Sequence, residues 1–161
     1  MADNDKPKRR KRQQWEAGDI FKITLSDGTY CLGRAVKHEP KAMNSLICAI
    51  YKTRLSAEDE NFCLIDDDLI SVLFVTRYSL DWGIWKVIGK TESAFAVEKY
   101  LNYDEAVNNK FVGTTITGCG NVNKLMEAYY CLRPWNSFHN PKFLDGLLIS
   151  EDIKPNKVIM V

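Results

Sequence analysis

The chain has 161 residues, of which 45% are hydrophobic and 27% charged, a composition typical of a globular protein. This length accommodates one domain with its own core and is short for two, so we expect a single domain over residues 15–161. No apolar run approaches the roughly 20 residues that cross a bilayer, and no apolar segment follows the basic N-terminus. We therefore expect a cytoplasmic protein with no membrane contact.

The net charge of +1 conceals an uneven distribution. Residues 1–14 are polar and lack periodicity, so we expect a disordered basic arm. The remaining chain is mildly acidic. Such an arm could bind a phosphate backbone, but Trp15 alone is not an aromatic stacking platform, so nucleic acid is not the expected partner. We expect Trp15 to pack against the sheet instead. The arm carries two carboxylates and six cations, which are Lys6, Lys8, Arg9, Arg10, Lys11 and Arg12.

Residues 15–36 predict a β-hairpin. The Asp27-Gly28 pair lies between two apolar, β-rich runs and supplies a turn that accepts positive φ. Because side chains alternate along a strand, Ile23 and Leu25 share one face of the sheet. Gly33 lies inside the second strand, where a missing side chain indicates a bulge or a close backbone approach.

The rest of the chain predicts more strands and then a helix. Apolar residues spaced by three and four predict a helix over 121–132, with Asn121 as N-cap and Pro134 as the stop. The expected fold class is therefore α+β: a curved, mainly antiparallel and partly barrel-like sheet with a packed C-terminal helix. The expected strands are 19–25, 29–37, 45–53, 69–78 and 84–89, with shorter ones at 100–103, 110–117 and 158–161, and a short helix at 141–148.

An acidic segment stands out between two of these strands. Residues 56–68 carry six carboxylates and no cation, and Ser56 could cap a short helical turn there. The segment is compatible with a solvated loop, with a patch that faces a basic partner, or with a divalent-metal site. The metal alternative lacks the Gly and terminal Glu of a calcium loop. The carboxylates are Glu58, Asp59, Glu60, Asp66, Asp67 and Asp68.

Aromatic residues near 78–85 offer a second candidate surface, since Trp and Tyr are enriched at interface hot spots. Trp85 follows the two-residue period of its strand, so we expect it in the core. Trp82 lies nearer a turn and is the better surface candidate.

Signatures of catalysis are lacking. The chain has no G-x-S-x-G elbow, no phosphate-binding glycine loop and no H-E-x-x-H helix. The five cysteines show no C-x-x-C spacing and are expected to be reduced, buried or half-buried thiols. Neither histidine stands at ligand spacing from a cysteine. We expect no enzyme activity, no cofactor and no metal.

The order Trp-x-x-Gly-Asp-Ile-Phe, Leu-Ser-Asp-Gly-x-Tyr and Gly-Arg across residues 15–34 resembles the opening of the immunity protein 26 family. Segments 46–51, 70–75 and 83–89 resemble its next strands, the last with a tryptophan before an apolar-Ile-Gly ending. The resemblance covers about residues 15–90. Members are small, mainly β proteins of bacterial polymorphic-toxin and contact-dependent inhibition systems, encoded beside a toxin that they neutralise by binding.

The resemblance implies a monomeric cytoplasmic antitoxin that occludes a cognate toxin domain, for example a nuclease, without doing chemistry. The toxin-facing surface is then expected on the six carboxylates of 58–68, with Trp82 as an apolar anchor. The alternative is a nucleic-acid-binding regulatory module that uses the basic arm. The residues that match the family motifs are expected to form the fold rather than to contact the toxin: Gly18, Asp19, Phe21, Gly28, Tyr30, Gly33, Arg34, Trp85 and Gly89.

Overall fold

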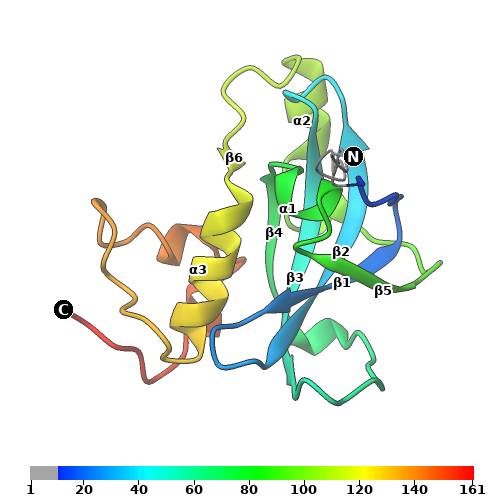
Figure 1. Ribbon diagram of the computed structural model, residues 1–161. Coiled ribbons are helices and arrows are strands. Elements are labelled where there is room, and N and C mark those ends of the chain that lie inside the picture. The colour runs from blue at the N-terminus through cyan, green and yellow to red at the C-terminus, as the bar shows by residue number, and fades with distance from the viewer. Residues whose placement is uncertain (1–10) are drawn as a thin grey trace, which may run out of the picture.

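The computed structural model describes residues 11–161. They form a six-stranded sheet in the order β5-β1-β2-β3-β4-β6 (Figure 1). Neighbouring strands from β5 to β4 run antiparallel, and β6 lies parallel to β4. The α+β class is confirmed, and the sheet ends at β5 and β6 without closing into a barrel. The strands are β1 (Asp19–Thr24), β2 (Tyr30–Glu39), β3 (Ser45–Leu55), β4 (Leu69–Val75), β5 (Lys86–Lys90) and β6 (Ile116–Thr117).

The hairpin of β1 and β2 forms as the sequence predicts. Gly28 has a φ of +87°, which a residue with a side chain rarely adopts. The N–H of Leu25 donates to the carbonyl of Thr29 across the turn (2.8 Å). Lys22 is therefore placed opposite Leu32 in the register of the two strands.

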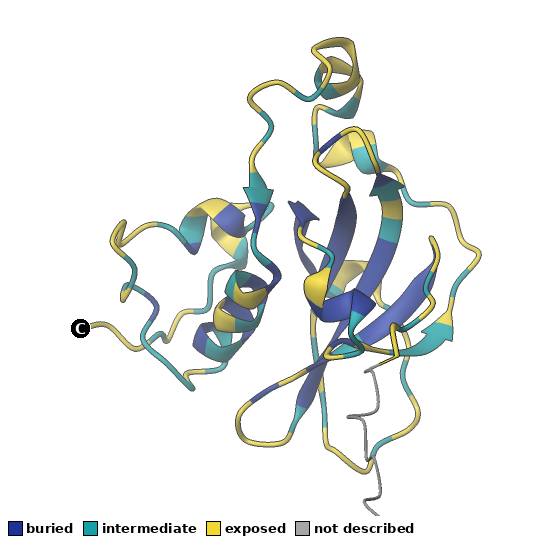
Figure 2. Cartoon of the chain, turned by 45° about the horizontal axis from the view of Figure 1, so that its top comes forward, coloured by how far each residue is buried: buried dark blue, intermediate teal, exposed yellow. Residues whose placement is uncertain are grey.

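Both faces of the sheet are buried, so the strands form a middle layer (Figure 2). One face packs against α3 (Cys119–Tyr129) and the chain that follows it. The other face is covered by the connections that follow β3 and β5. The first core includes Phe21, Ile23, Ile50, Val122, Leu125, Met126, Trp135 and Leu144, and the second includes Leu32, Ile47, Tyr51 and Val72.

A stack of two aromatic rings lies in the first core. Phe21 and Trp85 are parallel to within 8°, with ring centroids 4.9 Å apart. The Phe21 ring also lies directly over Gly33, its partner on β2, where a Cβ atom would overlap the ring. Trp85 Nε1 donates to Asn123 Oδ1 of α3 (2.8 Å). The core position of Trp85 is thus confirmed, and the close approach expected at Gly33 is that of an aromatic ring.

The N-terminal segment joins the fold before β1. Residues 1–10 of the predicted arm lie outside the described residues. At its end, the Gln13 carboxamide donates to the carbonyls of Leu80 (2.8 Å) and Trp85 (2.9 Å) and accepts from the N–H of Val87 (3.0 Å). Trp15 packs on the first core, as expected, and its Nε1 donates to Asp81 Oδ1 (2.8 Å).

The C-terminal helix differs from its expected bounds. It begins at Cys119, with Gly118 rather than Asn121 as N-cap, and ends at Tyr129. Cys131 has a φ of +59°, and the N–H groups of residues 131 and 132 bond back to Ala128 and Glu127. This is a Schellman motif, so a left-handed cysteine and not Pro134 ends the helix.

The expected strand at 100–103 is wrong, since the chain there leaves η2 (Val97–Lys99) and enters α2 (Tyr103–Asn108). Of the expected strand 110–117, only the two residues of β6 pair. Lys110 and Phe111 both have positive φ and close a second Schellman motif after α2, which interrupts any strand.

Three further expectations hold only in part. The strand expected at 69–78 ends at Val75, and α1 (Tyr78–Asp81) follows it. The expected helix at 141–148 is reduced to η3 (Asp145–Leu147), and η4 (Glu151–Ile153) follows. The closing strand at 158–161 is a single bridge between Ile159 and Pro134. None of the helices formed by residues 11–161 is long and apolar enough to cross a membrane.

We predict that Gly33→Ala lowers the free energy of unfolding by about 2–4 kcal/mol, because the new methyl group displaces Phe21 from Trp85. Urea unfolding followed by circular dichroism measures this change. Gly120→Ala is the matched control: it lies in α3 with no atom within 4 Å of the added carbon, and should be neutral or stabilising by up to about 1 kcal/mol. Equal stability of the two variants would contradict the prediction.

Candidate functional site

The acidic segment forms the connection between β3 and β4. Glu58, Glu60, Asp66 and Asp67 are exposed, and Asp59 and Asp68 are half-buried. Among residues 11–161, none of these six carboxylates has a cation within salt-bridge distance. Their charge is therefore available to a partner.

The first half of the segment is anchored to the sheet. The Tyr30 hydroxyl donates to the carbonyl of Asp59, and the Phe62 ring lies over Gly89, where a Cβ atom would come within 2.7 Å of it. Asp59 and Glu60 line a pocket of about 360 Å³, which Lys22 and Lys86 line as well. The predicted turn at Ser56 is a single hydrogen-bonded turn, from the N–H of Asp59 to the carbonyl of Ser56 (3.1 Å).

The second half is η1 (Asp66–Asp68), which leads directly into β4. Asp68 Oδ2 accepts a hydrogen bond from Thr53 Oγ1 of β3 (2.6 Å), whereas Asp66 and Asp67 make no side-chain hydrogen bond within the described chain. η1 thus holds two free carboxylates on a fixed backbone beside the sheet.

The carboxylates act on nearby tyrosines. Burial raises the pKa of Tyr30, and the charges of Asp59 and Glu60 raise it further. Burial and the charge of Asp68 likewise raise the pKa of Tyr129 on α3. The segment therefore has a negative field at both of its ends.

Trp82 lies apart from this segment. η1 precedes β4 and α1 follows it, so the acidic segment and α1 lie at opposite ends of the strand (Figure 1). The Arg12 guanidinium lies 5.2 Å from the centroid of the Trp82 ring. The structure therefore assembles the six carboxylates on one connection and does not bring Trp82 to them.

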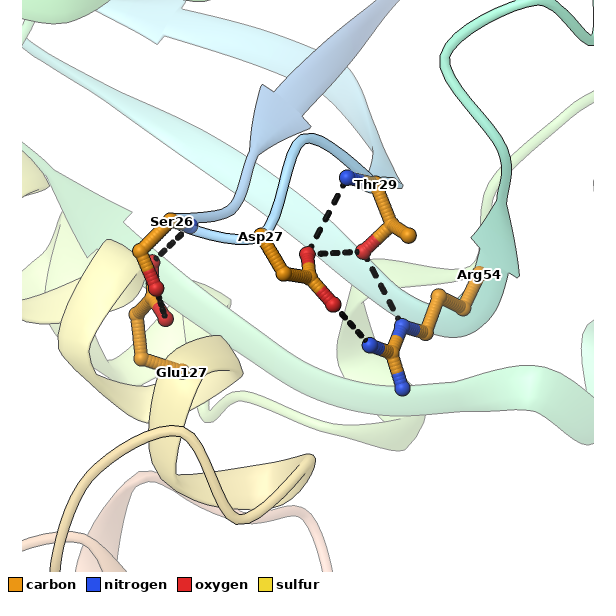
Figure 3. A network of polar contacts seen from close by, with 5 residues as sticks. All are labelled: Ser26, Asp27, Thr29, Arg54 and Glu127. Carbon is orange, nitrogen blue, oxygen red and sulfur yellow. Dashed lines mark hydrogen bonds and ion pairs between the residues drawn. The ribbon is translucent and has the colours of Figure 1, made fainter.

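A network of side chains lies beside the acidic segment, and the sequence did not predict it (Figure 3). Arg54, next to the start of the segment, pairs with Asp27 of the hairpin turn, which also accepts from the Thr29 hydroxyl (2.6 Å). Ser26 donates through its N–H (2.7 Å) and its hydroxyl (2.8 Å) to Glu127 of α3. Asp27 could be read as a turn residue, but no local signal pairs Ser26 with a helix 101 residues away.

A second pocket, of about 410 Å³, lies near α1. Residues 12–17 form one wall of it, and His38, Arg77 and Asp81 line the remainder. Trp15 packs against both the Arg77 guanidinium, 5.4 Å from its ring centroid, and the His38 ring, whose centroid is 5.7 Å away, and Arg77 Nη1 lies 3.0 Å from His38 Nε2.

All five cysteines are free, as expected. Cys31, Cys48 and Cys119 are buried, but Cys63 and Cys131 are exposed, so the expectation of burial is wrong for these two. Burial raises the pKa of Cys31 to about 12, which keeps it a protonated thiol at neutral pH. Within residues 11–161, no three His, Cys, Asp or Glu side chains form a group that could hold a metal ion.

The motif residues lie in structural positions. Asp19 Oδ2 accepts the N–H of Glu16 (2.8 Å), and the buried Arg34 donates to the Ser93 hydroxyl (3.2 Å). A Cβ atom on Gly18 would come within 2.5 Å of the Thr91 carbonyl oxygen. These contacts are within the fold and involve none of the six carboxylates of the acidic segment.

We predict that Asp27→Asn lowers the melting temperature at neutral pH. The Thr29 hydroxyl, then the Thr29 N–H and the Arg54 guanidinium, hold the pKa of Asp27 below its usual value. The stability that this carboxylate contributes is therefore complete above the unfolded pKa and is lost as the pH falls through the folded pKa. Thermal melts between about pH 7 and pH 2.5 should show the difference from wild type shrinking below about pH 4.

The control is Asp67→Asn, since Asp67 is exposed and makes no hydrogen bond through its side chain within the described chain. Its melting temperature should equal that of wild type at every pH. If Asp27→Asn lowered the melting temperature by the same amount at every pH, the role assigned to the charge would be contradicted.

Comparison with known proteins adds the family. A family model described as Immunity protein 26 matches residues 16–111. No curated protein and no solved structure matches the chain. The matched region includes β1 to β5, the whole acidic segment and α2, and it ends before β6 and α3. Because this match spans more than half of the sequence, the chain belongs to the Immunity protein 26 family.

Proposed function

We propose that this immunity protein binds a cognate toxin domain through its acidic segment and neutralises it by covering the active site. Family membership supports a toxin as the partner. The observation that carries the choice of surface is the set of unpaired, exposed carboxylates on an anchored connection.

The chemistry of this surface fits a nuclease toxin. A nuclease binds phosphates, so its active site is lined by positive charge. Carboxylates of the inhibitor replace phosphates in such a cleft, which raises the association rate and disfavours other partners. Asp66 and Asp67 suit a test of this role, because they are adjacent and exposed and their side chains make no hydrogen bond within the described chain.

Neutralisation by coverage requires a stoichiometric complex and no catalysis. We therefore propose a protein that is not an enzyme, acts as a monomer and meets its toxin in the cytoplasm. Trp82 is not part of the proposed contact, because α1 and the acidic segment lie at opposite ends of β4.

The test uses the toxin domain encoded by the neighbouring gene. Cells that express this domain should survive when they also express the immunity protein. In vitro, the double variant Asp66→Lys, Asp67→Lys should associate about ten-fold or more slowly than wild type at low salt. The difference should largely disappear near 1 M salt, where charges are screened within about 3 Å.

The matched control is Glu151→Lys, Asp152→Lys on η4, which also carries two adjacent exposed carboxylates. It changes the net charge equally, so its association rate should stay close to that of wild type. Equal slowing of both variants would mean that net charge alone matters, and an unchanged rate of the η1 variant would move the interface elsewhere.

A further inference from the structure

The end of the sheet near α1 presents aromatic side chains. Tyr78 is 58% exposed, and Trp82 is half-buried. The N–H of Trp82 bonds to the carbonyl of Tyr78 (3.1 Å), and this spacing of four residues places both side chains on one side of the short helix. Two accessible rings therefore lie together at this end.

Cations accompany these rings. Arg12 lies over Trp82 and also lines the 410 Å³ pocket, so it joins the ring to the pocket. Arg77 lines the same pocket and lies over Trp15. Each of these arginines is thus stacked on an indole ring.

The carboxylates of this pocket are already engaged. Asp81 Oδ1 accepts from Trp15 Nε1 (2.8 Å) and Arg77 Nη2 (3.2 Å), and Glu16 pairs with Lys90. Arg12 has no carboxylate partner within the part of the chain that the structure describes. Its guanidinium can therefore receive an anion from outside.

Arg12 is the last of the six cations that the sequence carries in residues 6–12. The pocket volume also lies within the range of about 300–1,000 Å³ typical of ligand sites. Cations along a backbone path together with accessible aromatic rings are the features by which proteins bind single-stranded nucleic acid.

We propose that this end of the molecule binds single-stranded nucleic acid, with a phosphate that draws Arg12 off the Trp82 ring and a base that stacks on this ring in its place. The sequence disfavoured such a partner because Trp15 was the only aromatic residue near the arm. The fold changes that argument, since it brings Trp82, 70 residues further along the chain, against Arg12 at the end of the arm.

The test measures fluorescence anisotropy of labelled 12-nucleotide oligo(dT), oligo(rU) and a 12-base-pair duplex with the full chain at several salt concentrations. Trp82→Ala should weaken single-strand binding about ten-fold or more, with an unchanged salt slope, because stacking is lost and no charge. Arg12→Gln should weaken binding and reduce the slope by about 0.7. Trp82→Phe, which keeps an aromatic ring, should restore most of the affinity.

Tyr100→Ala is the control, because Tyr100 is an exposed aromatic residue on the connection between η2 and α2 and not on α1. It should bind as wild type. The proposal is overturned if the wild type fails to bind either oligonucleotide at about 50 mM salt, or if Trp82→Ala binds like wild type. It is also overturned if oligoglutamate or heparin binds as tightly as oligo(dT) in all variants, since the arm alone then attracts any polyanion.

Discussion

The stack of Phe21 on Trp85 is the contact on which the other parts of the structure depend. It closes because Gly33 on β2 leaves room for the Phe21 ring. The indole N–H of Trp85 donates to the Asn123 side chain on α3, and the main-chain carbonyl of Trp85 accepts from the Gln13 carboxamide. One pair of rings thereby joins the hairpin, the edge strand, the helix and the N-terminal segment. Loss of the ring stack would weaken the attachment of all four segments at once. For this reason we expect an added methyl group at Gly33 to lower the free energy of unfolding and one at Gly120 not to.

Burial of both sheet faces leaves the two ends of the sheet for binding. One end presents the acidic segment, and the other presents α1 with Arg12 and Trp82. The seven residues of β4 separate them by about 20 Å, which is about twice the screening length at 0.1 M salt. At this separation, the surface that we propose for the toxin and the one that we propose for nucleic acid would act with little mutual interference.

The region that matches the family model does not complete the fold by itself. It supplies β1 to β5, but the core on one face is closed by residues that follow it. An apolar sheet face left open to water is unstable and promotes association. Residues 112–161 therefore complete the core on this face, and the single domain over residues 15–161 stays a prediction. The residues that cover this face include Val122, Leu125, Met126, Trp135 and Leu144.

Local chemistry in the sequence determined the hairpin at Asp27-Gly28, the core position of Trp85, the existence of the C-terminal helix and the acidic character of residues 56–68. Each depends on neighbours along the chain: a turn residue, a period of two, or a period of 3.6. Tertiary structure alone decided the path of residues 100–117, where left-handed Lys110 and Phe111 replace the expected strand, and the end of α3 at a left-handed Cys131. It also decided that Trp82 meets Arg12 rather than the acidic segment and that Ser26 meets Glu127. The physical reason is that periodicity reports which side of an element is apolar, whereas the segment that covers that side is selected by packing between residues far apart in the chain.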